Sequence, residues 1–361
     1  MPAAPTAVIA GTNFGARVHG RALQAAGYEV VGLVGRDVEK ARQRAEKGGL
    51  GQGFADIAEA LKLKPTVVAI ATPPHTHADI AHQAMDAGAH VVCEKPFTLD
   101  LGQADALAAK AGKLGLIGLL GHEFRYTESS ALFGRLLDEG AIGQPRLATF
   151  VAHGGLVKDP ELAMPEWWFD EASGGGWLGA SGSHAVDRVR DWYGEVAGVS
   201  ARLVLLTDRP GATADDTFEV HFRTVNGLTG TLQGTAAAWG PTVNVTRALG
   251  PGGAMWIEDL VKMGSVEAVS GDVFVADRNG VRQVPVPDDL KLDLTGIAPE
   301  FTRNVGPFAQ LYRDLKAMID GKRPADRRPR ASTFADGCAN MRLLDAIRAS
   351  SATDGAWISL V

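Results

Sequence analysis

The residue of this chain best placed to do chemistry is a lysine at the predicted end of a buried strand. Lys95 stands in Glu94-Lys95-Pro96, directly after the apolar run Val91-Val92-Cys93. A lysine amine can accept a proton from a hydroxyl group when its surroundings disfavour the charged form of the amine. We therefore expect Lys95 to act as an acid or a base. A structural cation that holds Glu94 or a cofactor hydroxyl is the alternative.

The elements that must position Lys95 form a β-α-β crossover. Residues 67–71 and 91–93 are apolar runs typical of buried strands, and residues 78–87 carry apolar side chains at helical spacing. Ligands bind at the carboxyl ends of the strands in open parallel sheets. Residues 72–77 and 94–96 are therefore predicted to line one crevice.

A glycine turn near the N-terminus predicts a nucleotide site. Residues 7–10 are typical of a strand and lead into Gly11-Thr12-Asn13-Phe14-Gly15-Ala16, and residues 17–26 have helical spacing. In this context glycines let the backbone approach a pyrophosphate at a helix N-terminus. Asn13 replaces the usual second glycine, and asparagine tolerates positive φ better than most residues. A tight β-α turn without a ligand is the alternative for this segment alone.

The second predicted strand, residues 29–34, ends at Gly35-Arg36-Asp37. An acidic residue here would bind the ribose hydroxyls of NAD, whereas an arginine would pair with the 2′-phosphate of NADP. Arg36 comes first, and Asp37 can instead cap the helix expected at 38–47. NADP is therefore the expected cofactor and NAD the alternative, since Arg36 could also stack on the adenine of either.

The alternation of apolar strands and helices predicts an α/β protein of two domains. Residues 1–122 are expected to form a dinucleotide-binding Rossmann domain with a doubly wound parallel sheet. Residues 123–361 are expected to form a C-terminal α/β domain with a large, mostly antiparallel open sheet. Its expected strands are 146–153, 199–206, 217–224, 228–235, 243–248, 255–258 and 273–276, and its expected helices are 132–139, 308–319 and 334–349.

Composition argues against several classes of function. The 361 residues are 45% hydrophobic and carry a formal net charge of −6, which gives no basic surface for nucleic acid or an anionic membrane. No apolar run approaches the ~18 residues of a membrane helix, and no signal peptide is evident, so we expect a cytoplasmic protein. Cys93 and Cys338 form no Cys-x-x-Cys pair and are expected to be reduced thiols. The basic loop 322–330 is expected to be a solvated connection.

Two segments together closely resemble one protein family. His-Val-Val-Cys-Glu-Lys-Pro at 90–96 and the glycine-rich segment 174–184 are similar to the Gfo/Idh/MocA family, the relatives of glucose-fructose oxidoreductase and inositol dehydrogenase. The resemblance spans nearly the whole chain. It implies that Lys95 helps to move the substrate hydroxyl proton, that His184 faces the substrate, and that the peptide before Pro96 is cis. It also implies a homodimer or homotetramer formed through the open sheet of a substrate-binding and oligomerisation domain, whose last helix could pack back on the first domain.

One position departs from the family pattern. Family members such as inositol dehydrogenase carry an aspartate four residues before the histidine, and Ala180 occupies that position here. The set of side chains expected to move the proton, Lys95 and His184, thus lacks a carboxylate. We expect Glu123 or Asp187 to substitute for it, or the substrate to be oriented differently.

The expected site has three groups of residues. Lys95 and His184 are the expected catalytic pair, and no metal is expected. The residues expected to bind the cofactor are Gly11, Thr12, Asn13, Phe14, Gly15, Ala16, Arg36, Thr72, Pro73, Pro74, His77, Glu94, Lys95, Pro96 and Arg125. The residues expected to bind the substrate are Lys95, Glu123, Tyr126, Trp167, Trp168, Ser181 and His184.

The predicted activity is hydride transfer between nicotinamide and the carbinol or carbonyl of a small molecule, namely a sugar, a cyclitol or a related cyclic polyol. Hydride removal from a carbinol requires a base for the hydroxyl proton, and Lys95 and His184 would supply it. Two alternatives are a glycosidase-like enzyme that uses transient NAD oxidation and a non-catalytic NADP-binding sensor. Ala180 makes the sensor plausible.

Overall fold

The computed structural model describes residues 4–162, 164–258, 271–322 and 328–361. It divides into two compact units, and the division falls within helix α9 (Phe334–Ala352). The first unit comprises Met1–Tyr126 and Leu292–Cys338, and the second comprises Thr127–Lys291 and Ala339–Val361. Most of the basic loop 322–330 lies outside the described residues.

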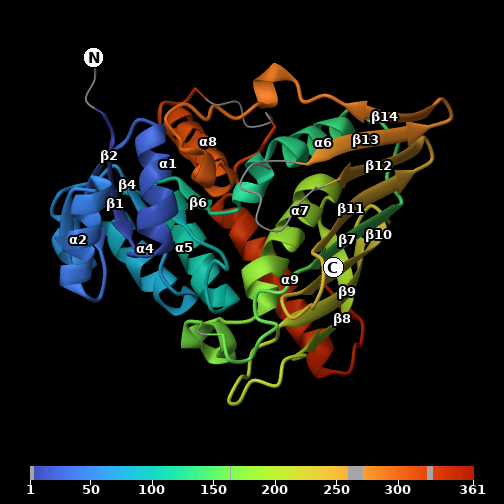
Figure 1. Cartoon of the computed structure of the whole chain (residues 1–361), viewed down its shortest axis with the longest axis horizontal. Coiled ribbons are helices and arrows are strands. Elements are labelled where there is room, and N and C mark those ends of the chain that lie inside the picture. Colours follow the sequence, from blue (N-terminus) through green and yellow to red (C-terminus); the bar gives the residue numbers. More distant parts are fainter. Residues whose placement is uncertain (1–3, 163, 259–270, 323–327) are drawn as a thin grey trace. The chain divides into compact units, whose positions relative to one another are not determined.

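The first unit contains a six-stranded parallel sheet, coloured blue to cyan in Figure 1. The strand order is β3-β2-β1-β4-β5-β6, so the direction of the crossovers reverses at β1, as in a Rossmann fold. The strands are β1 Thr6–Ala10, β2 Glu29–Val34, β3 Gln52–Phe54, β4 Val67–Ile70, β5 His90–Cys93 and β6 Gly118–Leu120. The helices are the π-helix η1 Gly15–His19, α1 Gly20–Ala25, α2 Val38–Gly48, α3 Ile57–Leu61, η2 Pro74–Thr76, α4 His77–Asp86, α5 Leu101–Leu114, η3 Glu123–Tyr126, η8 Pro299–Phe301 and α8 Thr302–Ile319.

Helix α8 belongs to the first unit although it lies late in the sequence. Its residues Phe308, Leu311 and Leu315 are fully buried in one apolar cluster with α1 and strands β1 and β2. Each such side chain contributes roughly 1.5–3 kcal/mol by leaving water. The sequence analysis placed this helix in the second domain, because its apolar stripe does not reveal which unit it covers.

The second unit is built on a nine-stranded sheet with the order β14-β13-β12-β11-β7-β10-β9-β8-β15. Only the β7–β10 pair is parallel among the strand pairs described, so the sheet is mostly antiparallel, as expected. The strands are β7 Leu147–His153, β8 Val196–Val204, β9 Thr217–Thr224, β10 Thr229–Thr235, β11 Val243–Gly250, β12 Gly253–Glu258, β13 Asp272–Asp277, β14 Gly280–Val284 and β15 Ile358–Ser359. The helices, besides α9, are α6 Glu128–Asp138, η4 Glu166–Phe169, η5 Glu171–Ser173, the π-helix η6 Leu178–Gly182, α7 Ser183–Tyr193 and η7 Asp288–Leu290.

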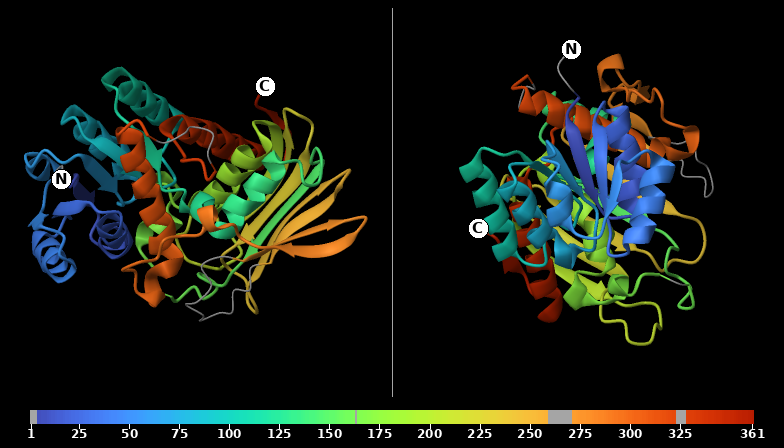
Figure 2. Two further views of the ribbon diagram at one scale, coloured as in Figure 1. Left: turned by 90° about the horizontal axis from the view of Figure 1, so that it is seen from above. Right: turned by 90° about the vertical axis from the view of Figure 1, so that its left-hand side faces the viewer.

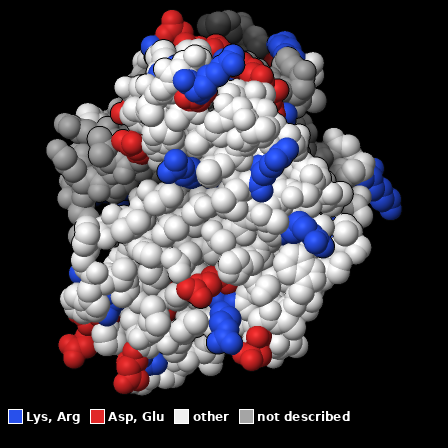
Figure 3. Space-filling model, turned by 90° about the vertical axis from the view of Figure 1, so that its right-hand side faces the viewer, with Lys and Arg blue, Asp and Glu red and all other residues white. Residues whose placement is uncertain are grey.

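Helices α6 and α7 cover one face of this sheet (Figure 2). An aromatic stack joins the layers, because Trp192 of α7 lies 4.6 Å from Phe133 of α6 and 5.8 Å from Phe150 of β7 between ring centroids. The opposite face carries few charged side chains over a broad area (Figure 3). Strand alternation and register assign Val245, Trp256 and Phe274 to this open face.

No helix within the described ranges is long and apolar enough to cross a membrane.

Candidate functional site

The turn after β1 has the close backbone approach that a pyrophosphate site requires. Gly11 has a φ of +122°, and a Cβ atom there would lie 2.2 Å from the carbonyl oxygen of Ala71 at the end of β4. A Cβ atom at Gly15 would lie 2.9 Å from Cγ2 of Ile9. Helical backbone begins at Gly15, where free N–H groups favour an anion. The turn therefore fits a dinucleotide, with Asn13 and Phe14 exposed at its tip.

The end of β2 carries the two residues that bear on cofactor choice. Arg36 is exposed directly after the strand. The carboxylate of Asp37 accepts a hydrogen bond of 3.0 Å from the backbone N–H of Lys40 and caps α2, as predicted. The Asp37 side chain is therefore engaged in the helix, whereas the Arg36 guanidinium projects from the surface.

The predicted Thr72–His77 and Glu94–Pro96 segments are joined by His77. Its ring is fully buried, with Nε2 2.8 Å from the carbonyl oxygen of Thr72 and Nδ1 3.1 Å from the carbonyl oxygens of Pro96 and Phe97. Burial lowers the pKa of His77, although these carbonyls oppose the shift. Both ring nitrogens of His77 thus face backbone carbonyl oxygens of the chain itself. The Lys95–Pro96 peptide is cis, as the resemblance implied.

Two buried carboxyl groups near Lys95 have opposite pKa shifts. Burial would raise the pKa of Glu94, but the hydrogen bond from His19 and the charges of His19 and Lys95 lower it below the ordinary value. Burial, and then the charge of Glu94, raise the pKa of Glu123 to about 8, against a lowering effect of Lys95. At neutral pH the site therefore holds one ionised and one protonated carboxyl group.

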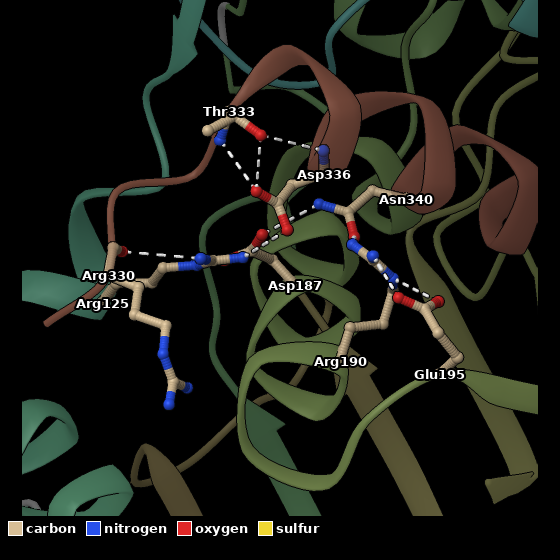
Figure 4. Close-up of polar contacts among 8 residues, drawn as sticks. All are labelled: Arg125, Asp187, Arg190, Glu195, Arg330, Thr333, Asp336 and Asn340. Atoms are coloured by element: carbon tan, nitrogen blue, oxygen red, sulfur yellow. Dashed lines mark hydrogen bonds and ion pairs between the residues drawn. The ribbon is translucent and has the colours of Figure 1, made fainter. Parts of the chain in front are cut away.

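Arg125 and Tyr126 follow Glu123 in η3, and both are buried. Arg125 donates to the carbonyl oxygen of Arg330 at 3.4 Å and pairs with Asp336 at 3.5 Å; the other Asp336 oxygen accepts from Thr333 at 2.8 and 2.9 Å (Figure 4). Tyr126, expected to stack on the substrate, belongs to the main apolar cluster and is only 1% exposed. It therefore offers no exposed ring, because the ring completes the core.

In the second unit, the segment before His184 is held by Asp215. The backbone N–H of Leu178 donates to the Asp215 carboxylate and the backbone N–H of Trp177 donates to its carbonyl oxygen, both at 2.8 Å. Gly176 has a φ of +104°, and a Cβ atom there would lie 2.4 Å from Oδ1 of Asp215. Burial raises the pKa of Asp215 to about 6. The glycine thus lets the carboxylate approach the start of the helix.

The helix that carries His184 starts earlier than expected. Serine is a typical helix cap, but neither Ser181 nor Ser183 caps this helix. The π-helix η6 runs directly into α7, so position 183 is interior, and the hydroxyl of Ser183 donates to the carbonyl oxygen of Gly179 at 2.6 Å. Ser181 is half-buried within η6, beside Ala180.

His184 is buried in α7, and the carboxylate of Asp187 one turn later is also buried. Asp187 accepts a hydrogen bond of 2.9 Å from the Asn340 side chain, which in turn accepts one of 2.9 Å from Arg190 (Figure 4). Asp187 and Arg190 thus connect α7 to α9 by hydrogen bonds to one side chain, Asn340.

Three half-buried indoles lie together ahead of α7. The ring centroids of Trp167 and Trp168 are 5.5 Å apart, and those of Trp168 and Trp177 are 6.3 Å apart. Aromatic surfaces of this kind suit the apolar face of a ring-shaped ligand. Among the described residues, Nε1 of Trp177 is buried and has no hydrogen-bond partner.

The sequence analysis did not identify His19, Tyr312 or Asp215 as residues that support the site. The only signal for His19 was a polar residue on the apolar side of its helix, next to Val18 and near Ala22. Nothing local pointed to Tyr312 or Asp215, because Tyr312 lies 293 positions from His19 and Asp215 lies 37 positions from Leu178 in the sequence.

A glycine turn after the first strand of a six-stranded parallel sheet with the order β3-β2-β1-β4-β5-β6 is typical of a dinucleotide-binding Rossmann domain. Residues 6–122 match the family described as "Oxidoreductase family, NAD-binding Rossmann fold", and residues 132–255 match the "GFO/IDH/MocA C-terminal domain". The chain belongs to the Gfo/Idh/MocA family of oxidoreductases.

Individual relatives agree with this membership. An uncharacterised oxidoreductase of Synechocystis sp. is 30% identical over 274 residues, which cover 72% of this chain and 70% of the relative. Levoglucosan dehydrogenase of Pseudarthrobacter phenanthrenivorans is 28% identical over 328 residues, 81% of this chain and 80% of the relative. The structure of a levoglucosan dehydrogenase in complex with NADH and levoglucosan superimposes with a TM-score of 0.84 at 22% identity, covering 99% of this chain and 100% of that one. This last likeness concerns the fold.

Proposed function

We propose that this protein is an NAD(P)-dependent dehydrogenase or reductase that acts on a CH–OH group of a sugar, a cyclitol or a related cyclic polyol. The observation that carries the proposal is the position of Lys95 at the carboxyl end of β5, on the same edge of the parallel sheet as the glycine turn at Gly11. Ligands of such sheets bind at this edge. The named sugar dehydrogenase among the relatives supports the substrate class.

The residues of the chain have to move a proton. When bound, the nicotinamide accepts or donates the hydride. Oxidation of a carbinol also breaks its O–H bond, and the Lys95 amine takes that proton; in the reverse direction its ammonium returns the proton to the alkoxide. We assign His184 of the second unit the role of the second acid–base group, on the strength of family membership.

Because residue 180 is alanine, the pair Lys95 and His184 lacks the carboxylate found in inositol dehydrogenase. Of the two expected substitutes, we favour Glu123. Its carboxyl group lies within the electrostatic influence of Lys95, whereas the Asp187 carboxylate is buried and engaged by Asn340. A protonated Glu123 can donate a hydrogen bond to a substrate oxygen, a role that an ionised carboxylate cannot fill.

We propose NADP as the preferred cofactor, with NAD as the alternative. Arg36 is exposed where the adenosine ribose would lie, and the Asp37 carboxylate caps α2. The levoglucosan dehydrogenase structure was determined with NADH, so the choice depends on the residues of this chain.

We further propose that the protein self-associates through the open face of the large sheet. Val243 and Val245 of β11 are more than one third exposed there, and Trp256 stacks on Phe274 at 5.5 Å beside them. A second copy of the chain would remove this apolar surface from water.

The test is a screen of sugars, cyclitols and polyols with NADP and NAD, followed by absorbance of the reduced nicotinamide. The proposal predicts net reduction with at least one cyclic polyol. Sugar release without net reduction would instead support the glycosidase-like alternative. Tight cofactor binding without any turnover would support the sensor.

A further inference from the structure

We propose that His19 and Tyr312 are positioning residues for the reaction proposed above, because a buried hydrogen bond from His19, which is itself hydrogen-bonded to Tyr312, holds the Glu94 carboxylate against the backbone of Lys95. This inference rests on the proposed function. His19 lies in the helix that follows the glycine turn, Glu94 at the end of β5, and Tyr312 in the middle of α8. The hydrogen bonds among these three residues thus connect η1, the end of β5 and α8.

Glu94, His19 and Tyr312 form a row of hydrogen-bonded side chains, and the chemistry of the carboxylate and the phenol decides which atoms donate. Nε2 of His19 lies 3.0 Å from Oε1 of Glu94, and Nδ1 lies 2.6 Å from the hydroxyl of Tyr312. An ionised carboxylate only accepts, so Nε2 must carry the proton that faces Glu94. On the other side of the ring, Nδ1 pairs with the Tyr312 hydroxyl, which burial keeps protonated by raising its pKa. This second hydrogen bond orients the imidazole so that its Nε2–H faces Glu94.

The surroundings of the imidazole restrict it to this geometry. His19 and Tyr312 are fully buried. The His19 ring packs on Phe308 with centroids 4.4 Å apart and meets the edge of Phe14 at 5.6 Å. Glu94 itself is only 9% exposed, so loss of the imidazole would leave its carboxylate short of a donor, which is costly for a buried charge.

The Glu94 carboxylate in turn holds the backbone of Lys95. Its second oxygen accepts the backbone N–H of Lys95 at 3.3 Å. A Cβ atom at Gly121 would lie 2.6 Å from Oε1, so the glycine after β6 provides the space that the carboxylate fills. The position of the carboxylate is therefore fixed by His19 on one side and by β6 on the other, and the peptide of Lys95 depends on it.

The ionisation of Glu94 depends on several groups besides His19. The titratable groups that interact with its charge are His19, His77, Cys93, Lys95, Glu123 and Tyr312. The hydrogen bond from the His19 side chain is the largest of the effects that lower the pKa of this carboxylate. Removal of this donor should therefore raise the pH at which Glu94 takes up a proton.

The test compares His19→Leu, which removes the donor, with His19→Gln, whose amide nitrogen can occupy the place of Nε2. Two quantities are measured: kcat for the best substrate of the screen, and the titration of the Glu94 carboxyl carbon by ¹³C NMR, assigned with Glu94→Gln. We expect His19→Leu to lower kcat by about 10- to 100-fold and to move the Glu94 titration to higher pH, and His19→Gln to restore much of both.

Tyr312→Phe and Tyr28→Phe form a matched pair in case His19→Leu does not fold. The Tyr28 hydroxyl donates to the backbone carbonyl of Tyr312 at 3.1 Å. Its loss removes a buried hydroxyl close to Tyr312 but leaves the hydrogen bonds among Tyr312, His19 and Glu94 in place. We expect Tyr312→Phe to lower kcat several-fold more than Tyr28→Phe. Equal effects of the two variants, or an unchanged Glu94 titration in His19→Leu, would overturn the inference. Absence of turnover in the wild type would defeat the proposed function instead, and the titration would still decide whether His19 holds Glu94.

Discussion

Glu123→Gln should change the pH dependence of stability in the first unit. The folded state raises the pKa of Glu123 to about 8 from an ordinary value of 4.5, chiefly by burial. The folded state therefore binds the proton more tightly than the unfolded state does. The stabilisation is fully present below about pH 4.5 and is lost as the pH rises through about 8. At about 1.4 kcal/mol for each pH unit, the loss approaches about 4–5 kcal/mol above pH 9.

Glutamine resembles the protonated acid and cannot ionise, so the variant should escape this loss. We expect nearly equal stability of the two proteins at pH 5 and a variant more stable by several kcal/mol at pH 9. The seven tryptophans all lie in the second unit, so their fluorescence would not follow the relevant transition. Hydrogen exchange of the β5 and β6 amides reports on the first unit directly.

Glu46→Gln is the control, because Glu46 is an exposed carboxylate of α2 in the same unit. Its stability difference from the wild type should stay small at every pH. A difference between Glu123→Gln and the wild type that does not vary between pH 5 and pH 9 would refute the assignment of a protonated Glu123.

Two further predictions concern cofactor choice and assembly. Arg36→Ala should lower kcat/KM for NADP by about 10-fold or more and leave kcat/KM for NAD nearly unchanged. The reason is that only NADP carries a 2′-phosphate for the guanidinium to bind. Equal losses with both cofactors would mean that Arg36 contacts the adenine instead. Val245→Lys should dissociate the proposed oligomer in light scattering after size exclusion, because it introduces a charge in the open sheet face. Val225→Lys, in the exposed turn between β9 and β10, should leave the mass unchanged. An unchanged mass for Val245→Lys would place any interface elsewhere.

Strands and helices with strong patterns were predictable from sequence. Strands β1, β2, β4 and β5 could be recognised because most of their residues are buried and therefore apolar. Strand β3 (Gln52–Phe54) was missed, since three residues with a central glycine carry no periodicity. Strand β14 (Gly280–Val284) was missed because it is an edge strand with mostly exposed side chains.

The site was predictable only where chemistry coincides with a local motif. The places of Gly11 and Lys95 after β1 and β5 could be predicted, because a glycine turn and the end of an apolar run are visible in the sequence. The support of Lys95 by His19 and Tyr312 could not, because the contact with Tyr312 joins residues 293 positions apart in sequence. The early start of the helix at Leu178 also escaped prediction, since three preceding glycines suggest a loop and give no signal for a π-helix.

The most direct test of the account is the turnover of Lys95→Ala with its cofactor affinity measured in parallel. The account predicts that kcat falls by about 10²- to 10⁴-fold, because the proton of the substrate hydroxyl loses its acceptor. The affinity for NADP should stay within a few-fold of the wild type, since the glycine turn at Gly11 is unchanged. Retention of more than about a tenth of wild-type turnover would contradict the central role of Lys95.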